Sequence, residues 1–492
     1  MAPRSPVPLD SSTGRVIIAT TVLGSAVAQL TATVVNVALP SIATDLDVGS
    51  AGQQWVNNAY LVTLASCILI GGSLGDRYGR RRVYEIGVAW FAVASILCAV
   101  APTVQVLIAA RLLQGVGGAL LTPGSLAIIE AALLPADRGR GVGAWSGLGG
   151  VAGAIGPLVG GIVVEWSWRW VFVINVPISI AVLVLARWMP ETWDPSTSDS
   201  PLDIGGAVLS VVVLGGSSYA LIEGAGGSAG WHVWLAGGLA VLALVALILR
   251  ERGRRGAMVP IDLFAVRPFA AANLVTFVVY GGLGVVFFML TIQLQVSAGW
   301  SPLAAGAALL PVTAVMLLLS SRAGAVATRI GPRWPLTVGP LVMAVGMWMI
   351  SMIGPEVSFV SDLLPATLVF GLGLATTVAP VTTAALGTVP DSRAGAASGT
   401  NNAVARAGQL LAVAAVPLVV GLTGDGLSDP VALDEHFGQA VRVAAGLVAL
   451  GGVLSLLMFR SGDLGVATTG EEPEVAPGVF QCGVDGPLVQ RR

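Results

Sequence analysis

The chain alternates between long apolar runs and short polar connections along almost its whole length. A membrane-spanning helix needs about 20 mainly apolar residues. By this measure the sequence predicts an all-α polytopic membrane protein with fourteen spanning helices. They cover roughly residues 16–39, 54–74, 83–101, 104–130, 142–164, 171–189, 204–222, 231–249, 269–295, 302–322, 335–353, 362–386, 395–421 and 437–459.

The polar connections divide this pattern into two six-helix bundles separated by an inserted helix pair. The expected parts are a cytoplasmic N-terminus (1–15), a first bundle (16–190), a linker (191–203), two inserted helices (204–250), a cytoplasmic basic amphipathic segment (251–268), a second bundle (269–460) and a cytoplasmic tail (461–492).

Composition agrees with a multi-pass protein of the cell membrane. Hydrophobic residues make up 55% of the chain and charged residues only 11%, whereas soluble domains carry about 25% charged residues. The net charge of −2 gives no nucleic-acid signature. Because lysine is absent, no Walker motif is present, and ATP is excluded as the direct energy source.

The arginines indicate the orientation. With the N-terminus placed inside, 21 of the 25 arginines fall in inner segments, and acidic residues dominate the outer loops. This positive-inside bias predicts that both termini lie in the cytoplasm.

One inner segment, residues 71–84 (GGSLGDRYGRRRVY), is repeated later in the chain. Gly72, Gly75, Arg77, Gly79 and Arg81 correspond to Gly324, Ala327, Arg329, Gly331 and Arg333 in GAVATRIGPR (324–333), at an offset of 252 residues. A second pair, PADR (135–138) and PDSR (390–393), matches at an offset of 255. The repeats predict two pseudo-symmetric halves, an architecture typical of transporters.

Other functional classes find little support. The three cysteines, Cys67, Cys98 and Cys482, match neither a disulfide framework nor a metal motif, and we expect no metal and no cofactor. No acid pair or nucleophile with a base is evident in the sequence, so we do not expect an enzyme.

Several motifs together resemble the major facilitator superfamily, and within it the fourteen-helix drug:proton antiporters. These motifs are Gly72–Arg81, Arg111–Gly117, Gly156–Gly161, Thr33–Pro40 and Trp168–Pro177. The resemblance covers roughly residues 15–460. It implies a secondary active transporter, a proton-coupled multidrug-type exporter of small, largely apolar molecules that works by alternating access. Its partners would be a small-molecule substrate, protons and the lipid bilayer, and we expect a monomer.

The charged inner loop is interpreted as a conformational latch, whose acidic member is Asp76. A loop that only anchors the topology is the alternative, but such an anchor has no need for an acid. The expected latch residues are Gly72, Asp76, Arg77, Gly79, Arg80 and Arg81.

The fifth span carries small residues at helical spacing together with a proline. Small residues allow close helix packing in lipid, and proline permits a bend. We therefore predict a hinge or a seal at Gly156, Pro157, Gly160 and Gly161, in addition to a packing role.

Charged and polar residues inside spans are the candidates for the transport cavity. A charge at membrane depth is costly and usually serves function, so Arg111 and Arg406 stand out. Hydrogen bonding to neighbouring polar groups is the alternative. The candidate set is Gln29, Thr33, Asn36, Asn58, Arg111, Gln114, Gln293, Asn402 and Arg406.

One departure from the resembled family concerns the first span. Many fourteen-helix antiporters carry an acid where this chain has Thr31, and no acid lies near the middle of any predicted span. The nearest acids, Asp76, Glu85 and Glu130, fall at the inner rim. Two further readings stay open: a carrier of anionic or zwitterionic metabolites without proton antiport, and a non-transporting membrane sensor that keeps the fold.

Overall fold

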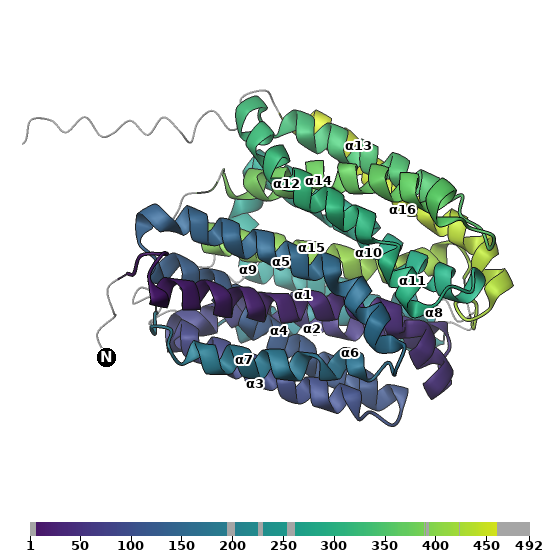
Figure 1. The fold of residues 1–492 in the computed structure, drawn as a ribbon, viewed down its shortest axis with the longest axis horizontal. Helices are drawn as coiled ribbons and strands as arrows, with labels where there is room; N and C mark the ends of the chain where they lie inside the picture. The colour runs from purple at the N-terminus through teal and green to yellow at the C-terminus, as the bar shows by residue number, and fades with distance from the viewer. Residues whose placement is uncertain are drawn as a thin grey trace, which may run out of the picture.

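The computed structural model describes residues 6–193, 202–224, 230–252, 261–387, 389, 393–422 and 424–459. Within these ranges the protein is built from helices that lie side by side (Figure 1). A single isolated bridge, between Val7 and Leu133, is the one β-type contact described there. It holds the start of the chain against the end of the fourth helix.

The helices before the linker form the first half of the molecule. They are α1 (Ser12–Leu46), α2 (Ser50–Tyr78), α3 (Arg80–Ala99), α4 (Val104–Ala132), α5 (Pro135–Val164), α6 (Trp170–Val173) and α7 (Asn175–Ala186). An inserted hairpin follows, composed of α8 (Ile204–Gly224) and α9 (Trp231–Glu251).

The remaining helices form the second half. They are the 3₁₀ helix η2 (Ile261–Ala265), α10 (Arg267–Ile292), the π-helix η3 (Gln293–Ser297), α11 (Pro302–Ala307), α12 (Leu310–Ile330), α13 (Arg333–Ile350), the π-helix η4 (Phe359–Leu363), α14 (Leu364–Leu386), α15 (Ala394–Val419) and α16 (Pro430–Met458).

Eleven helical stretches of the described residues are long and apolar enough to cross a membrane. The sequence predicted fourteen. Among the described residues of α5, the apolar stretch found is Ile155–Val164. The next predicted span is divided into α6 and α7, and its apolar stretch, Trp170–Ala186, is 17 residues long.

The arginine loop, Arg77–Arg82, lies where α2 ends and α3 begins. Gly79 separates the two helices with a φ of 106°, a value in the region that favours glycine. Its counterpart in the repeat, Gly331, separates α12 from α13 with a φ of 80°. Both copies of the motif therefore turn the chain through a glycine with positive φ.

Helices in corresponding places of the two halves make corresponding contacts. In the first half α1 packs on α5 and α7, and α4 packs on α2 and α3. In the second half α10 packs on α15 and α16, and α14 packs on α12 and α13. The internal packing thus repeats at the level of whole helices.

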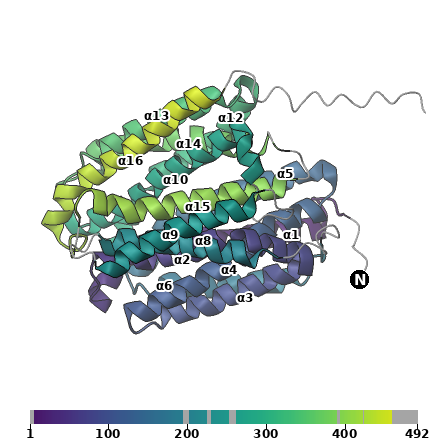
Figure 2. The same cartoon turned by 180° about the vertical axis from the view of Figure 1, so that it is seen from behind.

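The halves meet along two seams. One lies between α2 and α15, and the other lies between α5 and the pair α11 and α12. The inserted hairpin packs through α8 against α2 and α15, so it covers the first seam (Figure 2). Below, the end of the bundle that carries the arginine loop is called the arginine-loop end, and the other end is called the opposite end.

Candidate functional site

Arg406 joins the two halves in the middle of the bundle. It lies on α15, and its guanidinium donates a hydrogen bond to the side-chain oxygen of Gln29 on α1. Both side chains are partly buried. Two residues of the predicted set, 377 positions apart, therefore meet where the halves face each other.

Arg111 is enclosed within the first half. Its side chain is fully buried, and Nε donates to the Val56 carbonyl at 3.0 Å. Nη1 donates to Gln114 Oε1 at 2.6 Å, and the guanidinium lies 4.6 Å from the centre of the Tyr60 ring. Cation–π contact and charged hydrogen bonds compensate for part of the lost hydration. Arg111 thus ties α4 to α2 and does not face the second half in this conformation.

Gln114 extends this buried network to α3. Its Nε2 donates to Ser95 Oγ at 2.8 Å. Three helices of the first half are therefore held by one polar chain around a buried cation.

The polar residues of α1 mostly contact other helices of the same half. Thr31 is fully buried and donates to Asn175 Oδ1 at 3.1 Å, so an acid at this position would face α7 and not the space between the halves. Thr33 donates to the Gly153 carbonyl of α5 at 3.2 Å. Asn36 is also buried, and its Oδ1 has no hydrogen-bond partner within the described residues.

The other predicted cavity residues are dispersed. Asn58 is buried and accepts a hydrogen bond from Asn57 at 3.3 Å. Asn402 donates to the Ser398 carbonyl of its own helix at 3.1 Å. Gln293 donates to Asp434 on α16 at 2.8 Å, within the second half. The structure therefore does not gather these three side chains into one cavity.

Gln295 is a contact between the halves that the sequence reasoning missed. Its Nε2 donates to the Val37 carbonyl of α1 at 3.0 Å. The residue belongs to η3, and π-helical segments often mark functional positions. The sequence did offer a signal for this contact, because Gln295 follows Gln293 by two residues at the end of an apolar run.

The small residues of α5 face two different neighbours. A Cβ added to Gly156 would lie 2.0 Å from Thr33 Oγ1, and one added to Gly160 would lie 3.0 Å from Val34 of α1. Gly161 instead faces the second half, where a Cβ would lie 2.6 Å from the Pro302 carbonyl oxygen. The α5 glycines therefore serve packing inside the first half and also a seam between the halves.

The same seam brings two backbones into close contact from the other side. A Cβ added to Gly306 of α11 would lie only 2.1 Å from the carbonyl oxygen of Pro157. Pro157 lies in the interior of α5, and Gly306 packs so closely against its carbonyl group that there is no room for a side chain. Gly161, Pro157 and Gly306 together form a tight seam near the opposite end.

Hydrogen bonds also join the halves at the opposite end. The Ser50 amide donates to the Gly424 carbonyl at 3.2 Å, the Leu427 amide donates to Ser50 Oγ at 2.9 Å, and Gln53 donates to Ser428 at 2.9 Å. A polar pocket of about 650 Å³ lies beside them, lined by Pro40, Ala43, Thr44, Asp47, Val48, Gly49, Gln53, Val296, Asp425, Leu427 and Ser428.

At the arginine-loop end the predicted latch residues pair locally. Asp76 accepts a hydrogen bond from Arg80 at 2.7 Å across the Gly79 turn. Arg81 bonds Glu85 at 2.8 Å and donates to the Met189 carbonyl at 2.9 Å. These contacts all lie within the first half.

Two further latch residues, Gly72 and Arg77, also contact neighbours in the first half. Gly72 faces α4, where a Cβ would lie 3.5 Å from Pro123. The Arg77 guanidinium lies 5.5 Å from the centre of the neighbouring Tyr78 ring.

Glu191 is a member of this loop that the sequence reasoning missed. Its carboxylate accepts hydrogen bonds from the backbone amides of Arg81 at 2.9 Å and Arg82 at 3.2 Å. An acid at a helix N-terminus is favourable because the exposed amides carry partial positive charge. The linker after α7 therefore returns to cap α3.

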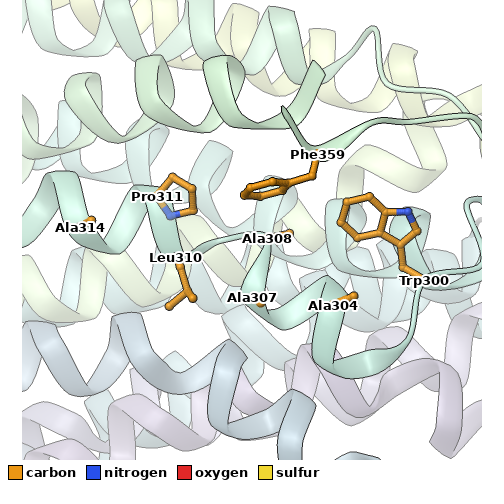
Figure 3. A pocket seen from close by; sticks show the side chains of 8 residues that line it. All are labelled: Trp300, Ala304, Ala307, Ala308, Leu310, Pro311, Ala314 and Phe359. Carbon is orange, nitrogen blue, oxygen red and sulfur yellow. The ribbon is translucent and has the colours of Figure 1, made fainter. Parts of the chain in front are cut away.

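An apolar pocket of about 730 Å³ lies in the second half near the opposite end (Figure 3). In this view the Phe359 ring lies between the side chains of Trp300 and Pro311. Its lining residues are Trp300, Ala304, Ala307, Ala308, Leu310, Pro311, Ala314 and Phe359. None of them belongs to the predicted cavity set.

No group of three or more His, Cys, Asp or Glu side chains in the described ranges is placed to hold a metal ion.

The family model of the Major Facilitator Superfamily matches residues 21–413 of the chain. The chain belongs to this superfamily. The protein is accordingly a multi-pass transporter of the cell membrane that takes small-molecule substrates, and it is not an enzyme.

Similar proteins include antibiotic resistance proteins. The methylenomycin A resistance protein of Bacillus subtilis (strain 168) is 37% identical over 316 residues, which cover 63% of this chain and 66% of that protein. The puromycin resistance protein of Streptomyces alboniger is 32% identical over 447 residues, covering 88% of each.

The fold also resembles solved transporter structures. One is a bacterial homologue of the human lysosomal transporter Spinster, described in an inward-facing, unoccupied conformation. It has a TM-score of 0.63 and 16% identity, and covers 90% of this chain and 96% of that chain. At this identity the likeness concerns the fold alone.

Proposed function

We propose that the protein is a proton-coupled exporter of small, largely apolar molecules that works by alternating access. The pairing of Arg406 with Gln29 carries this proposal, because it places a charge in the middle of the molecule between two halves of repeated packing. A charge at that depth usually serves function. The names of the similar proteins point to antibiotics such as puromycin and methylenomycin A as the substrate class.

The conformation described here represents one state of that cycle. Ser50, Gln53 and Gln295 bond across the halves at or near the opposite end, and Gly306 seals the α5 seam there. We propose that these contacts break when the halves rock to the other state, as expected for parallel repeats. The described state is then closed at the opposite end.

In the same proposal, fourteen helices span the membrane and both termini lie in the cytoplasm. The domain bounds predicted above apply, with the arginine-loop end inside. The arginine bias supports this orientation. The transporter acts as a monomer, since both halves of the proposed site come from one chain.

The arginine loop is proposed to act as a latch that exchanges partners during the cycle. In the described state Asp76 binds Arg80 of its own half. When the inner side closes, Asp76 and the neighbouring arginines become available to the second half. Asp76 and Arg80 are partly exposed, so breaking their ion pair costs little free energy.

The test is transport of puromycin into inverted membrane vesicles with an imposed proton gradient, acid inside. We expect accumulation that collapses when the gradient is dissipated and that falls strongly in Arg406→Ala. Glu356→Gln, a change of an exposed acid, serves as the control. Gradient-independent accumulation would refute proton coupling, and no accumulation of puromycin or methylenomycin A would refute the proposed substrate class.

Arg406 also supports a second candidate, a carrier of anionic or zwitterionic metabolites without proton antiport. A positive charge between the halves attracts anions. The same vesicles decide between the two, because competition by organic anions and indifference to the proton gradient are expected only for this carrier.

A further inference from the structure

The apolar pocket of Trp300 and Phe359 lies between two segments that pack on different halves. One wall is α11, which contributes Ala304 and Ala307, and the other wall is formed by α12 and by Phe359 at the start of η4. By sequence all of these segments belong to the second half. By packing they differ, because α11 lies mainly against α5 and α1 of the first half.

The attachment of α11 to the first half is close. A Cβ added to Gly306 would lie 2.1 Å from the Pro157 carbonyl oxygen, and one added to Gly161 would lie 2.6 Å from the Pro302 carbonyl oxygen. Helix α12 begins at Leu310, packs mainly on α14 of its own half and also meets α5. The two walls of the pocket are therefore joined by a short connection but are held mainly by different halves.

Both aromatic rings of the pocket are carried by backbone that departs from the α-helix. Trp300 follows η3, and its amide donates to the Leu294 carbonyl at 2.8 Å. Phe359 is the first residue of η4. Such π-helical turns are rare and often mark functional positions. Since η3 also carries Gln295, which bonds Val37 of α1, the Trp300 end of the pocket continues into a second contact between the halves.

The size and the lining of the pocket suit one class of small molecule. Its volume of about 730 Å³ lies within the range of roughly 300–1,000 Å³ that is usual for sites of drug-sized ligands. The described lining residues are all apolar, and Figure 3 shows the Phe359 ring between the side chains of Trp300 and Pro311. Aromatic side chains bind other rings by offset or edge-to-face contact. The occupant that fits is an uncharged aromatic molecule.

The charges near the pocket argue against a phospholipid as the occupant. None of the described lining residues is basic. The segment that leads into η4 carries Glu356, and η4 itself carries Asp362, and both acids are exposed. Lipid head groups are bound by clusters of basic residues. Acids on the segment that carries Phe359 therefore disfavour an anionic lipid.

We propose that this pocket is a second binding site, which takes uncharged aromatic molecules, and that its occupant holds the transporter in the described state. The inference rests on the alternating access proposed above. A ligand shifts an equilibrium between two states only through its different affinity for them. Here the affinities differ because rocking of the halves changes the spacing of the two walls, so the occupant loses contacts. A filled pocket keeps the opposite end closed and slows the cycle.

The binding test is photolabelling of the full protein in proteoliposomes. The probe is a trifluoromethyl phenyl diazirine, an uncharged aromatic molecule whose adducts are located by mass spectrometry, and the competitor is phenylnaphthylamine. We expect adducts on residues 300–314 that the competitor removes. Adducts that the competitor leaves unchanged, like those on the exposed apolar face of α9, would mean that acyl chains fill the pocket and would overturn the proposal.

Two variants change the pocket at exposed positions, where the fold tolerates substitution. Phe359 is 38% exposed, and Phe359→Ala removes one aromatic wall. Ala304 is exposed on α11, and Ala304→Phe places a ring in the pocket. Ala246→Phe is the matched control, because Ala246 is an exposed alanine of α9 outside the pocket. The competed adducts should be lost in both pocket variants and retained in the control.

The coupling test follows the opposite end through a single cysteine at Ala43, which lines the polar pocket there. The native cysteines are replaced in this background. At a phenylnaphthylamine concentration about ten times its dissociation constant, labelling by an impermeant thiol reagent should fall roughly tenfold with the native pocket and stay unchanged in Phe359→Ala. Competed adducts without any change in thiol labelling would overturn the coupling of the pocket to the described state.

These measurements need no transport, so they separate this inference from the function on which it rests. Absence of gradient-driven puromycin uptake refutes proton-coupled export and leaves the photolabelling result intact. The second reference is Gly306→Ala, which forces α11 away from α5. Loss of the ligand effect alone, with Gly306→Ala still raising the labelling of the cysteine at Ala43, refutes only the role of the pocket.

Discussion

Replacing Gly306 by alanine tests whether the seam between α5 and α11 holds the described state. The new Cβ would lie 2.1 Å from the Pro157 carbonyl oxygen, and ordinary contact begins at 3.4 Å, so α11 must withdraw by about 1.3 Å. Overpacking of this kind costs about 1–3 kcal/mol. The gain of about 1 kcal/mol in helix propensity of alanine over glycine is present in both states and cancels in their ratio, so the clash alone sets the shift, taken here at its lower value of about 1 kcal/mol.

A cost of about 1 kcal/mol shifts the ratio of the two states roughly fivefold away from the described one. The assay is labelling of a single cysteine at Ala43, which is 9% exposed and lines the polar pocket at the opposite end. The native cysteines are removed in this background. We expect labelling by an impermeant thiol reagent to rise roughly fivefold.

Gly143→Ala is the matched control, because Gly143 lies on α5 and has no atom within 4 Å of an added Cβ. It receives the gain in helix propensity without the clash. Equal labelling of the Gly306→Ala and Gly143→Ala proteins, with equal transport, would refute the idea that this seam holds the opposite end closed.

Three further predictions concern the latch, the central charge and the orientation. Asp76→Asn should slow transport with little loss of stability, because the Asp76–Arg80 ion pair contributes about 0.3–0.5 kcal/mol. The control, Glu85→Gln, breaks the similar Arg81–Glu85 pair and should transport normally. Equal transport rates of the two variants would mean that the loop serves only to anchor the topology. Arg406→Gln should remove a contact of about 1.5–3 kcal/mol between the halves. It should also improve efflux of quaternary ammonium dyes, because the positive charge of Arg406 repels cations. Strong dye efflux by the wild type would contradict this repulsion. A cysteine at Glu356 should be labelled from outside the cell and one at Arg82 only from inside, and the reverse pattern would invert the proposed topology.

The sequence was informative where a local rule determines the contact. The glycine spacing of the fifth span predicted close packing, and Gly156 and Gly160 do lie against α1. The repeat of the arginine loop placed Gly79 and Gly331 at matching positions, and both adopt positive φ. Each depends on residues a few positions apart.

The sequence was less informative where partners come from distant helices. Arg111 was placed in the membrane, but its enclosure depends on Val56 and Tyr60, which lie about 50 residues earlier on α2. Gln293 was assigned to the cavity, yet its partner is Asp434 on α16. Glu191 was assigned to a linker, and only the return of that linker to α3 reveals its role.

The inserted hairpin gives the molecule two unlike sides. It covers the seam between α2 and α15, while no helix of the described residues covers the seam between α5, α11 and α12 in the same way. We therefore expect an apolar compound dissolved in the bilayer to meet the inserted hairpin on one side of the molecule and α5, α11 and α12 directly on the other. On that other side α11 and α12 line the apolar pocket of Trp300 and Pro311. The insertion thus gives a bundle of repeated packing two different faces within the membrane plane.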